Sequence, residues 1–92
     1  MSDALSLDSR PALARKARLR YEQVRQTDLL LLPERVVKLN STGAAILRLC
    51  DGQRTVSEIV REVESQFGQP SLENDVVEFL RNVSAQGWIE LI

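Results

Sequence analysis

The chain has 92 residues, enough for one small domain, and its 43% hydrophobic and 27% charged residues give a typical globular balance. Twelve basic residues against thirteen acidic ones give a net charge of −1 and a pI of about 5.4, which disfavours binding to nucleic acid. Histidine is absent from the sequence, and this excludes Ser-His-Asp and Cys-His catalysis and every His-containing zinc site within the chain. The single cysteine, Cys50, cannot form an internal disulfide. Composition therefore predicts a small domain that is not an enzyme.

The start of the chain, MSDALSLDSR, does not have the basic and then apolar pattern of a signal peptide. The longest apolar run, Leu29–Leu32, is far shorter than a membrane span. We therefore expect a cytoplasmic protein without a membrane partner. Residues 1–17 have no sustained periodicity, and we expect them to form a flexible or loosely packed arm before a single domain in residues 18–92.

Three extended segments are predicted in the first half of this domain. They contain β-favouring residues, and they are separated by a turn at residues 25–28 and by Pro33, which cannot donate to a β-ladder. Connections this short favour an antiparallel meander. The predicted strands are Leu19–Val24, Leu29–Leu32 and Glu34–Leu39.

The four leucines of the middle strand put apolar side chains on both faces of the meander. One face can pack against helices, but the other needs a separate cover. Either the segment Pro11–Leu13 folds back over it, or a second subunit shares it. We expect the first arrangement and therefore a monomer, because the arm immediately precedes the first strand.

Helical periodicity begins after residue 40. Thr55 and Glu58 have the spacing of a capping box, and glycines at helix ends can adopt the left-handed conformation. A closing apolar segment, Trp88–Ile92, comes after the last helix. The expected helices begin at Asn40 or Ser41, at Thr55 and at Pro70–Ser71, and end at Asp51–Gly52, Gly68 and Gly87. Their predicted buried faces contain Ile46, Leu47, Leu49 and Cys50; then Val56, Ile59, Val60, Val63 and Phe67; then Leu72, Val76, Phe79, Leu80 and Val83.

These elements predict an α+β, winged-helix-like domain: a three-stranded antiparallel meander followed by a three-helix bundle. Many winged helices bind DNA through their last helix, which needs outward cations or amides. Here residues 55–67 and residues 71–87 each carry a net charge of −2, so they would repel phosphate. We expect no binding to nucleic acid, and a winged-helix transcription regulator remains the alternative. A structural subunit that dimerises through its leucine-rich sheet is a third possibility.

Two features favour binding of a peptide. The third strand lies at an edge of the meander, where unpaired backbone groups can recruit another strand. On the third helix, Val77 lies outside the predicted core stripe, among Glu73, Arg81 and Ser84. Val77 is either a singly exposed valine, which is common, or the wall of a groove between the third strand and the third helix. The residues alone favour neither reading.

The segment LLLPERVVKLN, residues 30–40, resembles the family of the pyrroloquinoline quinone (PQQ) biosynthesis protein PqqD. The resemblance covers roughly residues 11 to 92, although Ala17 stands where the family has glycine. The other matching residues are Pro11, Leu13, Arg18, Leu19, Asp51-Gly52, Thr55-Val56, Ile59-Val60, Asp75-Val76, Phe79-Leu80 and Gly87-Trp88-Ile89.

The resemblance implies a peptide chaperone of the kind called a recognition element for ribosomally made, modified peptides (RiPPs). Such a domain binds the precursor peptide PqqA and presents it to the radical-SAM enzyme PqqE. The iron–sulfur cluster and S-adenosylmethionine then belong to the partner, and this chain needs no cofactor. By position, the implied peptide-binding residues are Arg35, Val36, Val37, Lys38, Leu39 and Asn40 on the strand and Val76, Val77, Leu80 and Arg81 on the helix.

Overall fold

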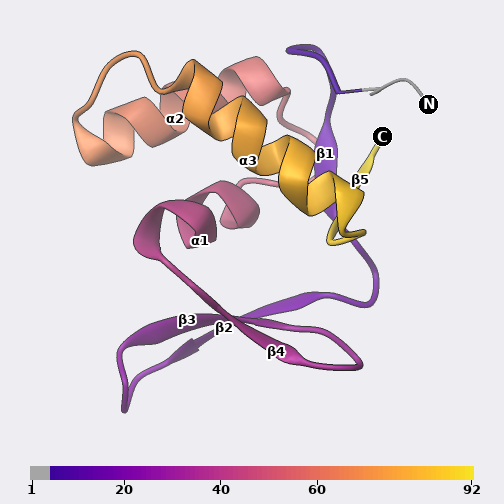
Figure 1. Ribbon diagram of the computed structural model, residues 1–92. Coiled ribbons are helices and arrows are strands. Elements are labelled where there is room, and N and C mark those ends of the chain that lie inside the picture. Colours follow the sequence, from indigo (N-terminus) through magenta and orange to yellow (C-terminus); the bar gives the residue numbers. More distant parts are fainter. Residues whose placement is uncertain (1–4) are drawn as a thin grey trace.

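A computed structural model describes residues 5–92 and arranges them in two small sheets and three helices (Figure 1). The three helices lie on one side of a three-stranded meander, and a separate pair of strands joins the two ends of the described chain. The predicted α+β, winged-helix-like architecture, a meander followed by three helices, is confirmed. In chain order the elements are β1 (Pro11–Leu13), β2 (Arg18–Glu22), β3 (Thr27–Leu31), β4 (Val36–Leu39), α1 (Ser41–Arg48), α2 (Val56–Phe67), α3 (Glu73–Ala85) and β5 (Ile89–Leu91).

The meander is antiparallel, with strand order β2-β3-β4. Leu30 of β3 faces the helices, where it is completely buried between Leu19 of β2 and Val37 of β4. The first hairpin turn begins earlier than the sequence suggested. Val24, expected in the first strand, lies in this turn and is 94% exposed, and the neighbouring Gln26 adopts a positive φ of 51°. A tight hairpin turn of this kind needs a residue with a positive φ, which Gln26 provides, so β2 ends before the turn, at Glu22.

The segment expected to be a loose arm is packed into the domain. β1 pairs with β5, with Ala12 opposite Glu90. On its other side, Leu13 donates its N–H to the Cys50 carbonyl at 3.1 Å. β1 therefore lies between two stretches of chain, and it does not cover the outer face of the meander. Residues 7–14 of the predicted arm are therefore not loosely packed, because their backbone bonds to α2, to β5 and to the loop after α1. Residues 1–4 of the arm lie outside the described part of the chain.

The residues before β1 complete the start of α2. The carbonyl of Ser9 accepts the Val56 N–H at 2.9 Å, and that of Leu7 accepts the Ser57 N–H at 3.1 Å. These amides are among the four at a helix N-terminus that have no partner within the helix. Leu5, just upstream, is 7% exposed and belongs to the core. The N-terminal segment is thus tied to α2 by its backbone and to the core by a side chain.

α1 begins as predicted and ends earlier than predicted. The Asn40 side chain caps it by accepting the Gly43 N–H at 2.7 Å. The helix ends at Arg48 rather than at residues 51–52. The cause is β1: Gly52 donates its N–H to the Pro11 carbonyl at 2.9 Å, and Asp51 forms a β-bridge with β1. An extended backbone is needed for these bonds, so the helix stops before them.

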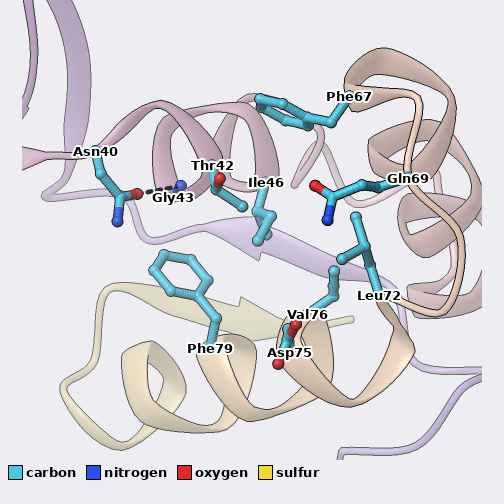
Figure 2. A pocket seen from close by; sticks show the side chains of 10 residues that line it. All are labelled: Asn40, Thr42, Gly43, Ile46, Phe67, Gln69, Leu72, Asp75, Val76 and Phe79. Carbon is cyan, nitrogen blue, oxygen red and sulfur yellow. Dashed lines mark hydrogen bonds between the residues drawn. The ribbon is translucent and has the colours of Figure 1, made fainter.

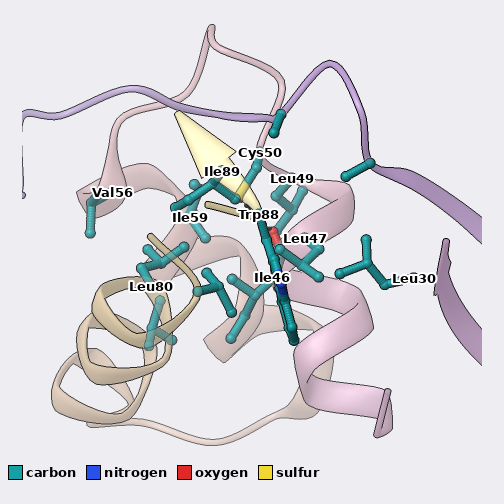
Figure 3. Packing of buried hydrophobic residues seen from close by; sticks show 14 of the residues in the cluster. Leu30, Ile46, Leu47, Leu49, Cys50, Val56, Ile59, Leu80, Trp88 and Ile89 are labelled. Atoms are coloured by element: carbon teal, nitrogen blue, oxygen red, sulfur yellow. Dashed lines mark hydrogen bonds between the residues drawn. The ribbon is translucent and has the colours of Figure 1, made fainter. Parts of the chain in front are cut away.

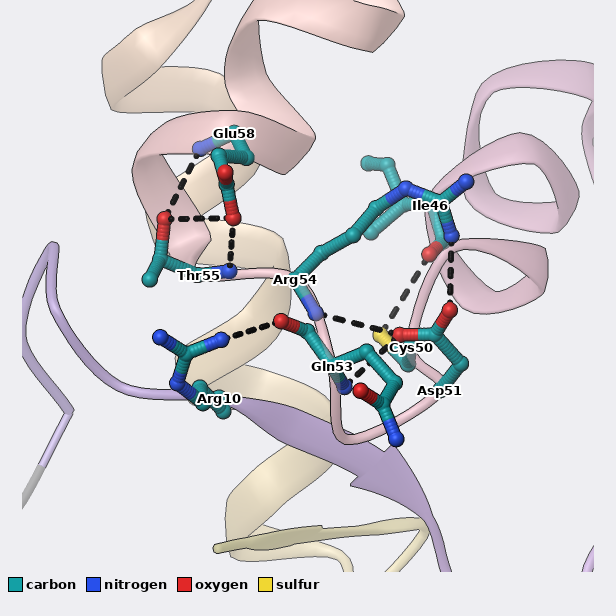
Figure 4. Close-up of polar contacts among 8 residues, drawn as sticks. All are labelled: Arg10, Ile46, Cys50, Asp51, Gln53, Arg54, Thr55 and Glu58. Atoms are coloured by element: carbon teal, nitrogen blue, oxygen red, sulfur yellow. Dashed lines mark hydrogen bonds and ion pairs between the residues drawn. The ribbon is translucent and has the colours of Figure 1, made fainter.

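The loop between α1 and α2 is held by side-chain caps (Figure 4). Thr55 and Glu58 form the predicted capping box, in which the Glu58 carboxylate accepts the Thr55 N–H at 2.8 Å. This backbone hydrogen bond lowers the pKa of Glu58 below its ordinary value. Asp51 accepts the N–H of Gln53 at 2.9 Å, and that bond is the main cause of its lowered pKa. Glu58, predicted as part of the capping box, and Asp51, which sequence analysis left unassigned, therefore both stabilise this turn.

The core lies between the helices and the inner face of the meander (Figure 3). α2 buries the predicted face except for Phe67, which is 39% exposed at its end. Cys50 is buried as predicted, and burial raises the pKa of its thiol to about 12, which leaves it an unreactive core residue. The largest completely buried side chains are Leu30, Ile46, Leu47, Ile59, Leu80, Val56, Val63 and Val76, together with Pro11.

Candidate functional site

β4 is an edge strand, because it has a neighbour in the meander only on the β3 side. At the turn between them, Leu32 and Arg35 exchange both backbone hydrogen bonds, at 2.9 and 3.3 Å. Bonded and non-bonded pairs alternate along an antiparallel ladder, so every second residue of β4 bonds to β3. Val37 and Leu39 bond to β3, whereas the N–H and C=O groups of Val36 and Lys38 point to the open edge. An incoming strand could pair with these four groups.

The inner side chains of β4 lie on the face of the meander that packs against the core, where β4 contacts α1. Val37 and Leu39 are half-buried and pack against the core. Arg35, on the same side, donates a hydrogen bond from its guanidinium to Gln86 Oε1 at 3.2 Å. Its guanidinium carbon also lies 5.7 Å from the centre of the Trp88 ring, within cation–π range. These contacts hold the start of β4 beside the C-terminal end of α3.

Beyond the end of β4, a pocket of about 310 Å³ opens between α1, the end of α2 and α3 (Figure 2). The Phe79 ring points into it toward the first turn of α1. A Cβ on Gly43 would lie only 3.2 Å from the Phe79 ring, so glycine lets the ring approach the helix backbone. The pocket is lined by Asn40, Thr42, Gly43, Ile46, Phe67, Gln69, Leu72, Asp75, Val76 and Phe79.

The expected site residues fall into three groups. Arg35 through Asn40 lie on or beside the open edge, as predicted. Val76 and Leu80, at 1% and 0% exposure, are core residues of α3. Val77 and Arg81 lie on the other flank of α3, where they line a shallow hollow with the N-terminal residues Leu5 and Leu7. The groove wall toward β4 was predicted at Val77, but this residue faces the N-terminal segment instead. Phe79, which lies on the side of the helix toward β4, is about 200° away from Val77 around the helix axis.

The side of α3 that faces β4 presents Phe79 and Gln86 instead. Sequence analysis assigned Phe79 to the core stripe and did not consider Gln86. A helical wheel could have indicated Phe79 as a candidate for this side, because Phe79 lies at one border of the core stripe and Val77 lies beyond the other border. Gly43, read only as a residue near a helix start, is the contact that allows Phe79 its position.

The side chains around β4 can bind but do not suggest a reaction. The pocket beyond its end has a single charged residue, Asp75, among mainly apolar and amide side chains. Within residues 5–92, histidine, cysteine and carboxylate side chains form no group able to hold a metal ion. In the same part of the chain, no helix is long and apolar enough to span a membrane. The arrangement is suited to holding an extended segment of another chain.

Fold and edge together define a small winged-helix-like α+β domain with an open strand beside its last helix. The family model "Coenzyme PQQ synthesis protein D (PqqD)" matches residues 29–89. The chain is 42% identical over 87 residues to a protein of Pseudomonas paraeruginosa named PqqA binding protein, covering 94% of this chain and 95% of that one. A protein of the same name from Methylococcus capsulatus is 37% identical over 89 residues, covering 97% and 96%. The chain therefore belongs to the PqqD family.

A solved structure has the same fold. It is the solution NMR structure of the PqqD truncation of Methylobacterium extorquens PqqCD, described as a functional and stand-alone RiPP recognition element. It superposes with a TM-score of 0.77 at 33% identity, and the match covers 95% of each chain. The resemblance seen in residues 30–40 thus extends over almost the whole fold.

Proposed function

We propose that this chain binds the precursor peptide PqqA in PQQ biosynthesis by adding it as a strand to the open edge of β4. One observation carries the proposal: a PqqD-family chain leaves the backbone groups of Val36 and Lys38 pointing outward beside an apolar surface. Relatives 37–42% identical over nearly their whole length are named for PqqA binding. In this arrangement the bound peptide lies between β4 and the Phe79 side of α3.

The free energy of binding must come mainly from side chains. If about six peptide residues become ordered, each costs about 1–2 kcal/mol. About five new backbone hydrogen bonds return about 0.5–1.5 kcal/mol each. Pairing alone therefore leaves no net gain or a deficit, whereas a micromolar complex needs about −8 kcal/mol. Apolar peptide side chains packed against Val37, Leu39 and Phe79 supply the difference, at roughly 1.5–3 kcal/mol for each that is fully buried.

Charge contributes to recognition at the start of β4. Arg35, just before this strand, is an exposed cation on the side of the proposed peptide, and it favours a peptide with a carboxylate near its binding segment. Arg35 is already oriented by Gln86 and Trp88, so it can pair with a peptide carboxylate with little further loss of side-chain freedom. Cation placement gives the peptide a preferred direction along the strand.

The chain then acts as a cytoplasmic peptide chaperone that presents PqqA to the radical-SAM enzyme PqqE, which holds the iron–sulfur cluster and S-adenosylmethionine. Strand addition supports this role, because it immobilises one segment of the peptide and leaves the remainder extended for the enzyme. The chaperone itself carries out no reaction and is a monomer.

An amide NMR titration of the labelled chain with synthetic PqqA tests ligand and site together. We expect the largest shifts at residues 35–40 and on the Phe79 side of α3, and small shifts at α2. Saturation at micromolar peptide supports the proposal. Shifts concentrated around Val77 and Leu7 would place the peptide on the other flank and overturn the β4 site, and no shifts at millimolar peptide would overturn PqqA binding itself.

A further inference from the structure

The outer face of the meander has no cover within residues 5–92. All three helices lie on the opposite face (Figure 1), and β1 pairs with β5 rather than folding over the sheet. Side chains alternate along each strand, so the outer face can be read from the register. Two cross-strand rows form most of it, and the pair of Glu22 and Thr27 lies at its far end. The rows are Arg18, Leu31 and Val36, and then Arg20, Leu29 and Lys38.

This face combines an apolar centre with a border of positive charge. Leu29 and Leu31 occupy the central strand, and Val36 is 59% exposed beside them. Arg18, Arg20 and Lys38 flank the leucines and are all exposed. In the part of the chain that the structure describes, the ion pairs are Arg25–Glu22, Arg48–Asp28 and Arg54–Asp51, and none of them includes these three cations.

The charges decide which occupant fits. A second copy of this chain would place three cations against the same three cations, at a repulsive cost. Glu22, at the far end of the face, lies 3.9 Å from Arg25 and so offers little compensation. An apolar surface bordered by carboxylates would bury the leucines and pair with the cations. The complementary partner is therefore acidic and is not this chain.

The shape of the face favours a folded protein over a peptide. β3 is bonded on both sides, so its backbone has no groups left for an added strand. An extended peptide gains its direction and register from such groups, which lie at the edges of the meander and not on its face. The outer face presents side chains alone, as flat surfaces between folded proteins do.

We propose that the outer face of the β2-β3-β4 meander docks the enzyme that modifies the bound peptide, through an acidic and partly apolar patch on that enzyme. This inference rests on the proposed function. Lys38 belongs to both sites, its backbone to the peptide edge and its side chain to the outer face. An enzyme docked there lies next to the peptide without competing for the edge.

The test measures two affinities for each variant: that of the chain for synthetic PqqA, and that of the chain–PqqA complex for purified PqqE. Arg20→Glu reverses a cation on β2, two strands away from β4 and its proposed peptide site. Leu29→Thr removes apolar area with a β-favouring residue. Arg61→Glu, an exposed cation on α2, is the matched charge control.

We expect Arg20→Glu to weaken PqqE binding at least about tenfold and Leu29→Thr by about fivefold, with Arg61→Glu close to the parent chain and PqqA affinity unchanged in all three. Unchanged PqqE binding by folded Arg20→Glu and Leu29→Thr would overturn the inference and leave peptide binding standing. Equal losses in Arg61→Glu, or a loss of PqqA binding in Arg20→Glu, would overturn it too. So would a dimer of the parent chain in sedimentation that Leu29→Thr dissociates. Failure of the parent chain to bind PqqA would instead refute the proposed function.

Discussion

Val77 and Phe79 are two positions apart on α3, both apolar and both half-buried, yet their surroundings differ completely. Val77 lies beside the N-terminal segment at Leu5 and Leu7. Phe79 rests against Gly43 at the start of α1 and faces the end of β4 (Figure 2). The Val77 flank of the helix packs against the N-terminal segment of the same chain, and the Phe79 flank borders the open edge of β4. An apolar residue beside a core stripe therefore indicates that the residue makes a contact, but it does not identify the segment that it contacts.

The two flanks also separate stability from binding. The flank at Val77 is continuous with a segment whose carbonyls complete α2, so changes there act on folding. The flank at Phe79 meets a pocket and an edge strand, so changes there act on what the domain can hold. Leu80 lies between the flanks and is completely buried.

The largest effect is expected at the residue that supports both flanks. Leu80→Ala removes a completely buried side chain from the centre of the core and should lower the free energy of unfolding by about 2–5 kcal/mol. Urea unfolding followed by circular dichroism measures this loss. A cost below about 1 kcal/mol would mean that α3 packs less tightly than its burial indicates.

The two flanks can be compared directly with Phe79→Ala and Val77→Ala. We expect Phe79→Ala to weaken PqqA binding about tenfold or more, because a peptide side chain loses its aromatic contact. Val77→Ala should keep the affinity within about twofold and lower the free energy of unfolding slightly. Calorimetric titration of both folded variants gives the answer. A reversed order would return the groove to the Val77 flank.

Local rules of sequence predict most of the elements, whereas features that depend on the tertiary arrangement escape them. The meander, the three helices, the Asn40 cap, the capping box and the edge strand are consequences of periodicity, capping and short connections. The end of α1 and the packing of β1 could not be predicted locally, because both depend on pairing between residues 11–13 and the distant residues 50–52. The flank of α3 that lies toward β4 is set by tertiary packing, in which the Phe79 ring lies beside Gly43 of α1. A helical wheel gives both borders of the stripe equal weight, so the polar neighbours of Val77 favoured the wrong flank.

The open edge itself can be tested with proline, which lacks an N–H group. Lys38→Pro removes a donor that points outward, and edge strands tolerate proline at such positions. We expect a folded protein whose affinity for PqqA is about three- to tenfold lower, the value of one hydrogen bond. Val37→Pro is the matched variant: it removes a bond to β3, so it should destabilise the sheet. Normal peptide affinity in folded Lys38→Pro would exclude backbone pairing at this position.

The smallest effect is expected away from both flanks, in the capping box of α2. The Glu58 carboxylate has a pKa below its ordinary value of 4.5, chiefly because it accepts the Thr55 N–H. A lowered pKa in the folded state means that the charged carboxylate adds stability above the ordinary pKa and loses it as the pH falls through the folded value. Glutamine at this position keeps a hydrogen-bond acceptor for the box but cannot ionise.

The difference in free energy of unfolding between the parent chain and Glu58→Gln should therefore be largest near neutral pH and shrink as the pH drops below 4.5. Asp51 also has a lowered pKa, but it is present in both proteins and cancels in the difference. Urea unfolding at a series of pH values measures the trend. A difference independent of pH would show that the Glu58 charge adds nothing to the cap. PqqA affinity at neutral pH should be the same for both proteins, since α2 lies outside the proposed site.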